Sequence, residues 1–253
     1  SPILTKHPND VQLNKRLFER VQQVYHQHRE LTPEEQMLLE KTYDSFVRSG
    51  ALLNDEEKAQ LRKLTEQASM LTLQFSQNLL KENKAYTLHI TDEKQLDGLP
   101  DTARDAAAHT AKERNLQGWV FTLDAPSYSP FMTYSTQRDL RHQMYMARNT
   151  VGTHDNPENN LKICQQLVNL RREIAQLLGY DTYADYILKH RMASDTDRVY
   201  QLLNDLIDAY KPTAMQEKKS LEELAKRLEG NEFEIQPWDI AYYSHKLQME
   251  RYN

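Results

Sequence analysis

The sequence predicts a mainly α-helical fold with long helical hairpins and a bundle, and three observations lead to this class. Apolar residues recur at spacings of three and four over most of the chain, as on one face of an α-helix. Glycine is scarce, with 6 in 253 residues. Charged residues make up 27% of the chain, which suits long helices with broad solvated faces. The one exception is a short region with strand-like alternation.

The N-terminal part of the chain predicts three helices. The first covers residues 11–29. Its apolar residues share one face: Leu13, Leu17, Val21 and Val24. The second helix begins with a capping box, in which the Thr32 hydroxyl and the Glu35 carboxylate each accept a backbone N–H. Asn54 and Glu57 repeat this pattern before a long third helix, and we expect the second and third helices to pack as an antiparallel pair.

The pattern changes in the next part of the chain, where a small two-stranded β ribbon is expected. Apolar and polar side chains alternate in residues 85–91, and residues 118–123 are rich in residues that favour strands. An alanine-rich helix is predicted between the two strands, at about residues 102–114.

A hinge or lobe boundary is expected near residues 124–136. Two prolines and two serines follow the second strand, a composition typical of loops. Pro130 suits the first turn of a helix that should resume at about Ser129, and a further helix is predicted from Thr136 to Asn149.

The helix at residues 160–178 is predicted to be central and largely buried, because its apolar stripe is wide. The single cysteine, Cys164, lies in the second apolar row of this stripe, so we expect a buried and inert thiol. Gly179 should end the helix, since glycine tolerates a positive φ, and Thr182 should cap a short helix that follows. Three tyrosines are expected to pack around this corner: Tyr180, Tyr183 and Tyr186.

Two further helices are predicted in the C-terminal part. Ser194 and Asp197 form a variant of the capping box before a long helix, which Pro212 should kink or break and Gly230 should end. The last helix shows no stop signal before Asn253, so we expect the chain to be a section of a longer polypeptide.

Composition argues against two classes of partner. The formal net charge of -5 comes from 32 basic and 37 acidic residues mixed along the chain, so we expect no nucleic-acid partner. No run is long and apolar enough to cross a bilayer, and the N-terminus lacks the apolar core of a signal peptide. We therefore expect no membrane partner and a cytoplasmic location.

No catalytic motif is complete in this sequence. A common zinc hydrolase places two histidines one helical turn apart with a Glu after the first, and none of the nine histidines shows this pattern. His26 and His28 lie two apart, so their rings would point to different sides of a helix. A Gly-rich phosphate loop and a serine elbow are also missing from the sequence. We assign no catalytic and no metal-binding residue.

Five tyrosines leave two interpretations open, a peptide-binding wall or the core, and helical spacing favours the core. They are Tyr180, Tyr183, Tyr186, Tyr242 and Tyr243. Substrate-binding residues therefore stay unassigned.

Several segments resemble the zinc metallopeptidases related to thimet oligopeptidase. The segments are LRREIAQLLGY (170–180), YADY (183–186), MA (192–193), RSGA (48–51), LTLQFSQNLL (71–80) and QPWDIAYY (236–243). They follow the family order over nearly the whole chain. The resemblance points first to the bacterial peptidyl-dipeptidases and next to oligopeptidase A.

This resemblance implies a mostly helical, two-lobed peptidase whose deep channel admits short unstructured peptides. It implies zinc and oligopeptide substrates in a full-length parent, which we expect to be a monomer. The His-Glu-x-x-His helix of the family lies downstream of residues 236–243, so this section would form channel wall and lid, hold no zinc and cleave no peptide alone. Apolar faces made for missing neighbours favour self-association of the section.

The alternative is a helical protein-interaction module that keeps the peptidase-like pattern without a catalytic half. A His-Glu-x-x-His motif in the source gene beyond residue 253 would distinguish the two hypotheses.

Overall fold

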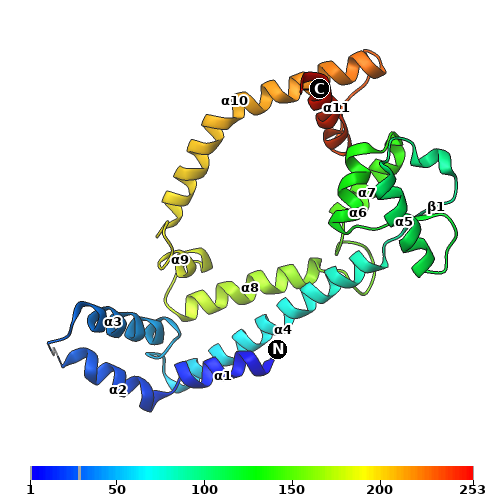
Figure 1. Ribbon diagram of the computed structural model, residues 1–253. Coiled ribbons are helices and arrows are strands. Elements are labelled where there is room, and N and C mark those ends of the chain that lie inside the picture. The colour runs from blue at the N-terminus through cyan, green and yellow to red at the C-terminus, as the bar shows by residue number, and fades with distance from the viewer. Residues whose placement is uncertain (1, 28–29, 253) are drawn as a thin grey trace. The chain divides into compact units, whose positions relative to one another are not determined.

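The computed structural model describes residues 2–27 and 30–252, and for residues 2–5 only the backbone. These residues are mainly helical, as predicted, with a two-stranded antiparallel sheet (Figure 1). The helices are α1 (Pro2–Gln12), α2 (Lys15–His26), α3 (Pro33–Arg48), α4 (Asp55–Ala85), α5 (Asp101–Glu113), α6 (Ala125–Tyr134), α7 (Arg138–Asn149), α8 (Leu161–Leu177), α9 (Tyr183–Leu188), α10 (Thr196–Glu229) and α11 (Ile240–Tyr252). The strands are β1 (Leu88–Ile90) and β2 (Trp119–Phe121), and the 3₁₀ helices are η1 (Glu93–Leu96) and η2 (Pro237–Asp239).

The chain forms two compact units. Unit 1 contains Ser1–Gln77 and Asn160–Leu202, and unit 2 contains Asn78–Asn159 and Leu203–Asn253. In the described residues, no helix combines the length and the apolar character that a membrane span requires.

The first predicted helix is divided in two. The Asn14 side chain accepts a hydrogen bond from the Leu17 backbone N–H at 3.0 Å, so it caps a new helix, α2, after α1 has ended. The end predicted at residue 29 falls on residues that the structure does not describe.

Helix α3 packs against α2 in unit 1, which differs from the predicted pairing of α3 with α4. The Phe18 ring lies 5.7 Å from the Tyr43 ring and 5.9 Å from the Phe46 ring, measured between centroids. Phe18 is buried, whereas Leu17 and Val24 of the predicted apolar face are exposed. The buried face of α2 is therefore formed by Phe18 together with Val21 of the predicted row.

Helix α4 packs against α8 and the end of α1. Leu61 and Leu64 of α4 share a buried cluster with Leu13 and Ile174. The predicted capping boxes of α3 and α4 are both confirmed: Thr32 with Glu35, and Asn54 with Glu57.

Helix α8 is buried along its first apolar row and at Ala175 of the second, so the expectation of a largely buried helix was too broad. Cys164 is exposed, and Val168 is 64% exposed. The prediction of a buried thiol was therefore wrong, because the second apolar row is packed only toward the end of the helix, at Ala175 and Leu178. Gly179 has a φ of 83°, and the Thr182 side chain accepts from the Asp185 N–H at 3.1 Å, so the predicted helical corner is confirmed.

The β ribbon in unit 2 has the predicted strands, with Leu88 opposite Phe121. Gly118 precedes β2 with a φ of 87°, and a β-carbon there would clash with the Ile90 carbonyl oxygen. Both the turn and the close strand approach therefore require glycine. Helices α5, α6 and α7 pack against the ribbon around a cluster that includes Phe131 and Met144.

Helix α6 begins at Ala125, four residues before the predicted start at Ser129. Pro126 occupies the first turn, where its missing N–H costs nothing, and Pro130 lies inside the helix. The segment whose proline and serine content is typical of a loop is thus helical in the structure. Residues 124–136 lie within unit 2, and a hinge there stays a prediction.

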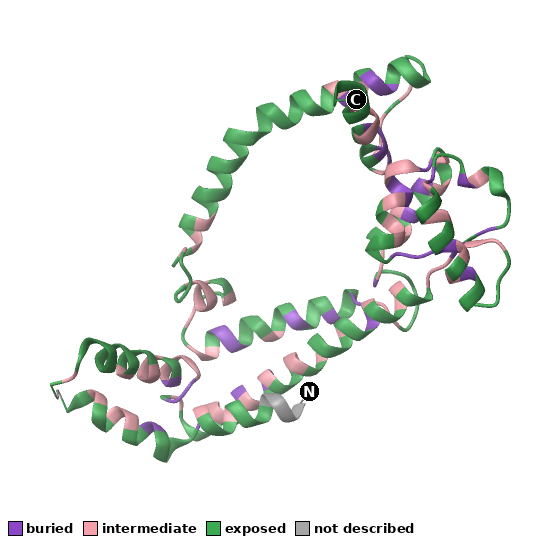
Figure 2. Ribbon diagram, in the orientation of Figure 1, coloured by how far each residue is buried: buried purple, intermediate pink, exposed green. Residues whose placement is uncertain are grey.

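Helix α10 differs from the prediction at its start. The cap is Asp195, which accepts from the Arg198 N–H at 2.9 Å, because Ser194 has a φ of 64° and lies outside the helix. The predicted kink or break at Pro212 is not a break, because the helix continues through this residue, and it ends before Gly230. Residues around Pro212 are exposed (Figure 2), so water can hydrate the carbonyl that proline leaves without a donor.

Candidate functional site

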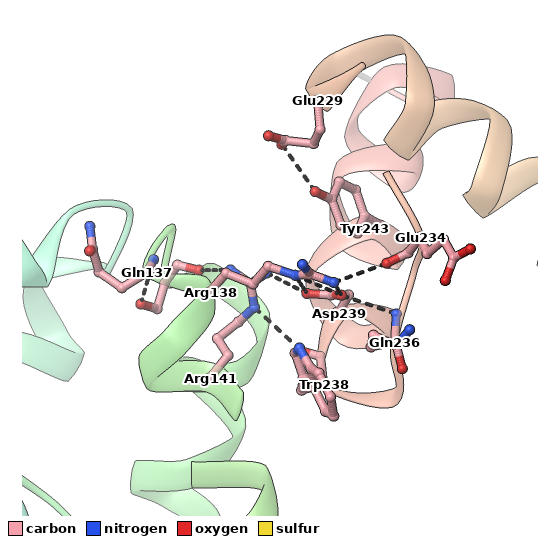
Figure 3. Close-up of polar contacts among 10 residues, drawn as sticks. Gln137, Arg138, Arg141, Glu229, Glu234, Gln236, Trp238, Asp239 and Tyr243 are labelled. Atoms are coloured by element: carbon pink, nitrogen blue, oxygen red, sulfur yellow. Dashed lines mark hydrogen bonds and ion pairs between the residues drawn. The ribbon is translucent and has the colours of Figure 1, made fainter. Parts of the chain in front are cut away.

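The most buried polar cluster joins the start of α7 to the segment before α11. Arg138 and Arg141 lie three residues apart, on one face of α7, and both bind Asp239 at the end of η2 (Figure 3). We call these three residues the Asp239 cluster. Arg138 Nη2 donates to Asp239 Oδ2 at 2.8 Å, and Arg141 Nη2 donates to Oδ1 at 2.8 Å.

Both arginines also donate to backbone carbonyl groups. Arg138 Nη2 donates to the Glu234 carbonyl at 2.9 Å, and Arg141 Nη1 donates to the Ser135 carbonyl at 2.7 Å. Asp239 is 0% exposed and Arg141 is 1% exposed. A buried charge is costly unless it is paired and hydrogen-bonded, and here both conditions are met.

Burial and hydrogen bonding act in opposite directions on the Asp239 carboxyl. Burial by itself would raise the pKa of Asp239, but hydrogen bonds from Arg138, Arg141 and the Gln236 backbone N–H together hold this pKa below its ordinary value. The carboxylate is therefore ionised at neutral pH, and each oxygen already accepts hydrogen bonds.

Aromatic rings enclose the Asp239 cluster. The guanidinium carbon of Arg141 lies 4.2 Å from the Tyr242 ring centroid, and that of Arg138 lies 4.4 Å from the Phe233 centroid. The Tyr243 hydroxyl donates to Glu229 Oε1 at 3.0 Å. Burial raises the pKa of the Tyr243 hydroxyl, and its hydrogen bond to the Glu229 carboxylate raises this pKa further.

The Asp239 cluster is suited to holding two segments of the chain together, and not to catalysis or metal binding. An ionised carboxylate with a lowered pKa, held by two arginines, is a weak general base and has no free oxygen for a metal. The cluster instead fixes η2, directly before α11, on the start of α7. Arg138 and Asp239 lie about 100 residues apart in the sequence.

A second polar cluster in unit 2 centres on Glu82 of α4. His154 Nδ1 lies 2.5 Å from Glu82 Oε1, Asn156 Nδ2 donates to the same oxygen at 3.0 Å, and the Gly152 backbone N–H donates to Oε2. Burial would raise the pKa of Glu82, but these three partners lower it on balance. The cluster ties the connection between α7 and α8 to α4.

The five tyrosines left open by the sequence fall into two groups. Tyr242 and Tyr243 are buried in a cluster with Leu221 and Ala225, as the core interpretation predicts. The other three are partly buried and contact one another through the Tyr186 ring, whose centroid lies 5.3 Å from that of Tyr180 and 5.7 Å from that of Tyr183.

The described part of the chain brings no set of zinc ligands together. In residues 2–27 and 30–252, no three His, Cys, Asp or Glu side chains gather as metal ligands. His26 ends α2, and His28 lies outside the described residues. Asp239 is the most buried acidic side chain among the described residues, and its carboxylate already accepts hydrogen bonds from two arginines.

In the sequence, Asp239 stands near the N-terminus of the last helix, where an acidic residue is common for its interaction with the helix dipole, so its pairing with Arg138 and Arg141 was missed. Their spacing of three residues would place them on one helical face. Nothing local distinguishes a buried arginine from an exposed one, because its partner lies about 100 residues away.

Comparison with known proteins gives a consistent picture. The family model described as "Peptidase family M3" matches residues 131–253. Oligopeptidase A of Escherichia coli (strain K12) is 37% identical over 212 residues, which cover 82% of this chain and 31% of the relative. Dipeptidyl carboxypeptidase of the same organism is 31% identical over 254 residues, covering 99% of this chain and 37% of the relative.

Saccharolysin of Saccharomyces cerevisiae (strain ATCC 204508 / S288c) is 30% identical over 223 residues, covering 85% of this chain and 30% of that protein. The chain thus spans about a third of the length of the curated relatives it matches.

Proposed function

We propose, on the premise that this chain belongs to peptidase family M3, that it is the non-catalytic wall and lid of a longer zinc peptidase that hydrolyses short unstructured peptides. The observation that carries this proposal is the match to peptidases along nearly the whole chain, which reaches 99% of it for dipeptidyl carboxypeptidase. The sequence contains no His-Glu-x-x-His motif, so the zinc chemistry would belong to the rest of the parent.

The role of the present residues is to hold helices in place. The Asp239 cluster and the Glu82 cluster each fix a connection that the local sequence leaves free. Rigid helical walls would exclude folded proteins from the site and position an extended peptide. We keep release of C-terminal dipeptides as the preferred activity, a cytoplasmic location for the parent and a monomeric parent as parts of this proposal.

The test begins with the source gene beyond residue 253. The full-length product is expected to contain His-Glu-x-x-His, to bind zinc in a one-to-one ratio and to cleave a fluorogenic peptide until a chelator is added. Peptides with a free and with an amidated C-terminus would separate dipeptide release from internal cleavage. A gene without the motif, or zinc-dependent cleavage by the 253-residue chain itself, would contradict the proposal.

A further inference from the structure

Helix α10 carries one apolar face along its length, and α11 covers only the C-terminal part of that face. Leu221, Leu224 and Ala225 are buried there, and Leu221 and Ala225 share a cluster with Tyr242 and Tyr243 of α11. In its C-terminal part, the apolar face of α10 therefore packs against a second helix of the same polypeptide.

The same pattern occurs 18 residues earlier, which is about five turns of an α-helix, so the side chains share one direction. Leu203, Leu206, Ile207 and Tyr210 correspond in turn to Leu221, Leu224, Ala225 and Leu228. We call the first four residues the open face. They are exposed by 48%, 41%, 55% and 66%, respectively, and the helix around them has no buried residue (Figure 2).

The width of the open face indicates the kind of neighbour it fits. At about 100° per residue, the four side chains spread over roughly 100° of the helix circumference, which is typical of a helix packed on a globular core. A paired coiled coil of two copies uses a narrower seam. Polar residues occupy the other side: Asn204, Asp205 and Asp208.

We infer that the open face is an internal docking surface for the part of the parent polypeptide that this chain lacks, which packs on it as α11 packs on the later turns. Relatives about three times as long as the matched region supply the length for such a segment. The occupant is an apolar helical surface of the same protein. This inference rests on the proposed function, because it requires a longer parent.

The experiment uses the full-length parent and measures the rate at which hydroxyl radicals modify Tyr210. In the native parent we expect modification about tenfold slower than in the same protein unfolded in urea, as for a covered side chain. Leu206→Asp, which places a charge in the open face, should remove this protection. Asn204→Asp introduces the same residue on the opposite side and should leave the protection unchanged.

Three outcomes would overturn the inference: equal rates in the native and unfolded parent, protection that appears only at concentrations where the parent dimerises, or a gene that ends with this chain. The wild-type comparison decides the matter even if Leu206→Asp fails to fold. Peptide cleavage is measured on the same preparation. Cleavage with an unprotected Tyr210 rejects this inference alone, whereas protection without cleavage rejects only the proposed activity.

Discussion

At the scale of single residues, the strongest constraint is the pairing of Asp239 with two arginines. The Asp239 carboxylate and Arg141 are both buried, and Arg141 Nη2 donates to Asp239 Oδ1 at 2.8 Å. Removal of one member of such a group is costly because the other charge stays buried without a partner. Arg138 is partly exposed, so its own charge can be hydrated when the pairing is lost.

Asp239→Asn is therefore expected to lower the free energy of unfolding by about 3–5 kcal/mol at pH 7. Urea denaturation followed by circular dichroism measures this loss. Asp205→Asn, at an exposed position of α10, is the matched control and should change stability by less than about 0.5 kcal/mol. Equal effects of the two substitutions would show that the pairing contributes nothing specific.

The pKa of Asp239 also predicts how stability depends on pH. This pKa is lower in the folded than in the unfolded protein, so the unfolded state binds more protons as the pH falls. The contribution of Asp239 is complete above the ordinary Asp pKa of about 3.9 and is lost as the pH falls through the lower folded value. The stability difference between wild type and Asp239→Asn should stay constant from neutral pH down to about 5 and shrink below about 4. A difference that shrinks near neutrality would contradict the direction of the shift.

At the scale of elements, a loop between two helices can be ordered by polar contacts with a distant helix, which the sequence of the loop does not reveal. The residues between α7 and α8 contain no regular structure, yet three of them bind Glu82 of α4. Hydrogen bonds to a charged group contribute about 1.5–3 kcal/mol each, so this carboxylate orders the connection.

Glu82→Gln should increase hydrogen exchange at Gly152 and its neighbours, because the amide side chain keeps one acceptor but loses the charge that His154 and the Gly152 N–H contact. Hydrogen exchange with mass spectrometry measures the change. Glu66→Gln, on an exposed turn of the same helix, should leave exchange at residues 150–156 unaltered. Unchanged exchange in Glu82→Gln would mean that backbone contacts alone order the segment.

Pro212 offers a test of helix energetics, because α10 continues through it. Proline in a helix interior removes one backbone hydrogen bond and is less favourable than alanine by up to about 3 kcal/mol. Pro212→Ala should therefore raise the free energy of unfolding, which urea denaturation would measure. A loss of stability would instead show that the proline ring itself stabilises the folded chain.

At the scale of the whole molecule, the chain forms two compact units, each with its own apolar clusters, and it leaves many large apolar side chains exposed. Exposed apolar faces of this extent are a liability in an isolated chain. They are expected when neighbouring parts of a longer polypeptide are missing.

The 253-residue chain by itself should therefore self-associate as its concentration rises. Sedimentation velocity over a range of concentrations measures this, and Leu206→Asp should weaken it by removing one exposed apolar side chain from the open face. Asn204→Asp is the control that adds the same charge elsewhere. A chain that stays monomeric at every concentration would show that its exposed apolar side chains do not associate.

The sequence by itself determined the fold class, most helix boundaries, the ribbon, the capping boxes of α3 and α4, and the family. These features depend on the local spacing of residues, on caps and on short segments that resemble the family in the same order. Only the tertiary structure decided three features: that Cys164 is exposed, that α2 packs against α3, and that Asp239 pairs with two arginines. An apolar row shows which face of a helix is suited to burial, but only a packed neighbour makes that face buried. A charged side chain likewise gives no local sign of a partner that lies about 100 residues away in the chain.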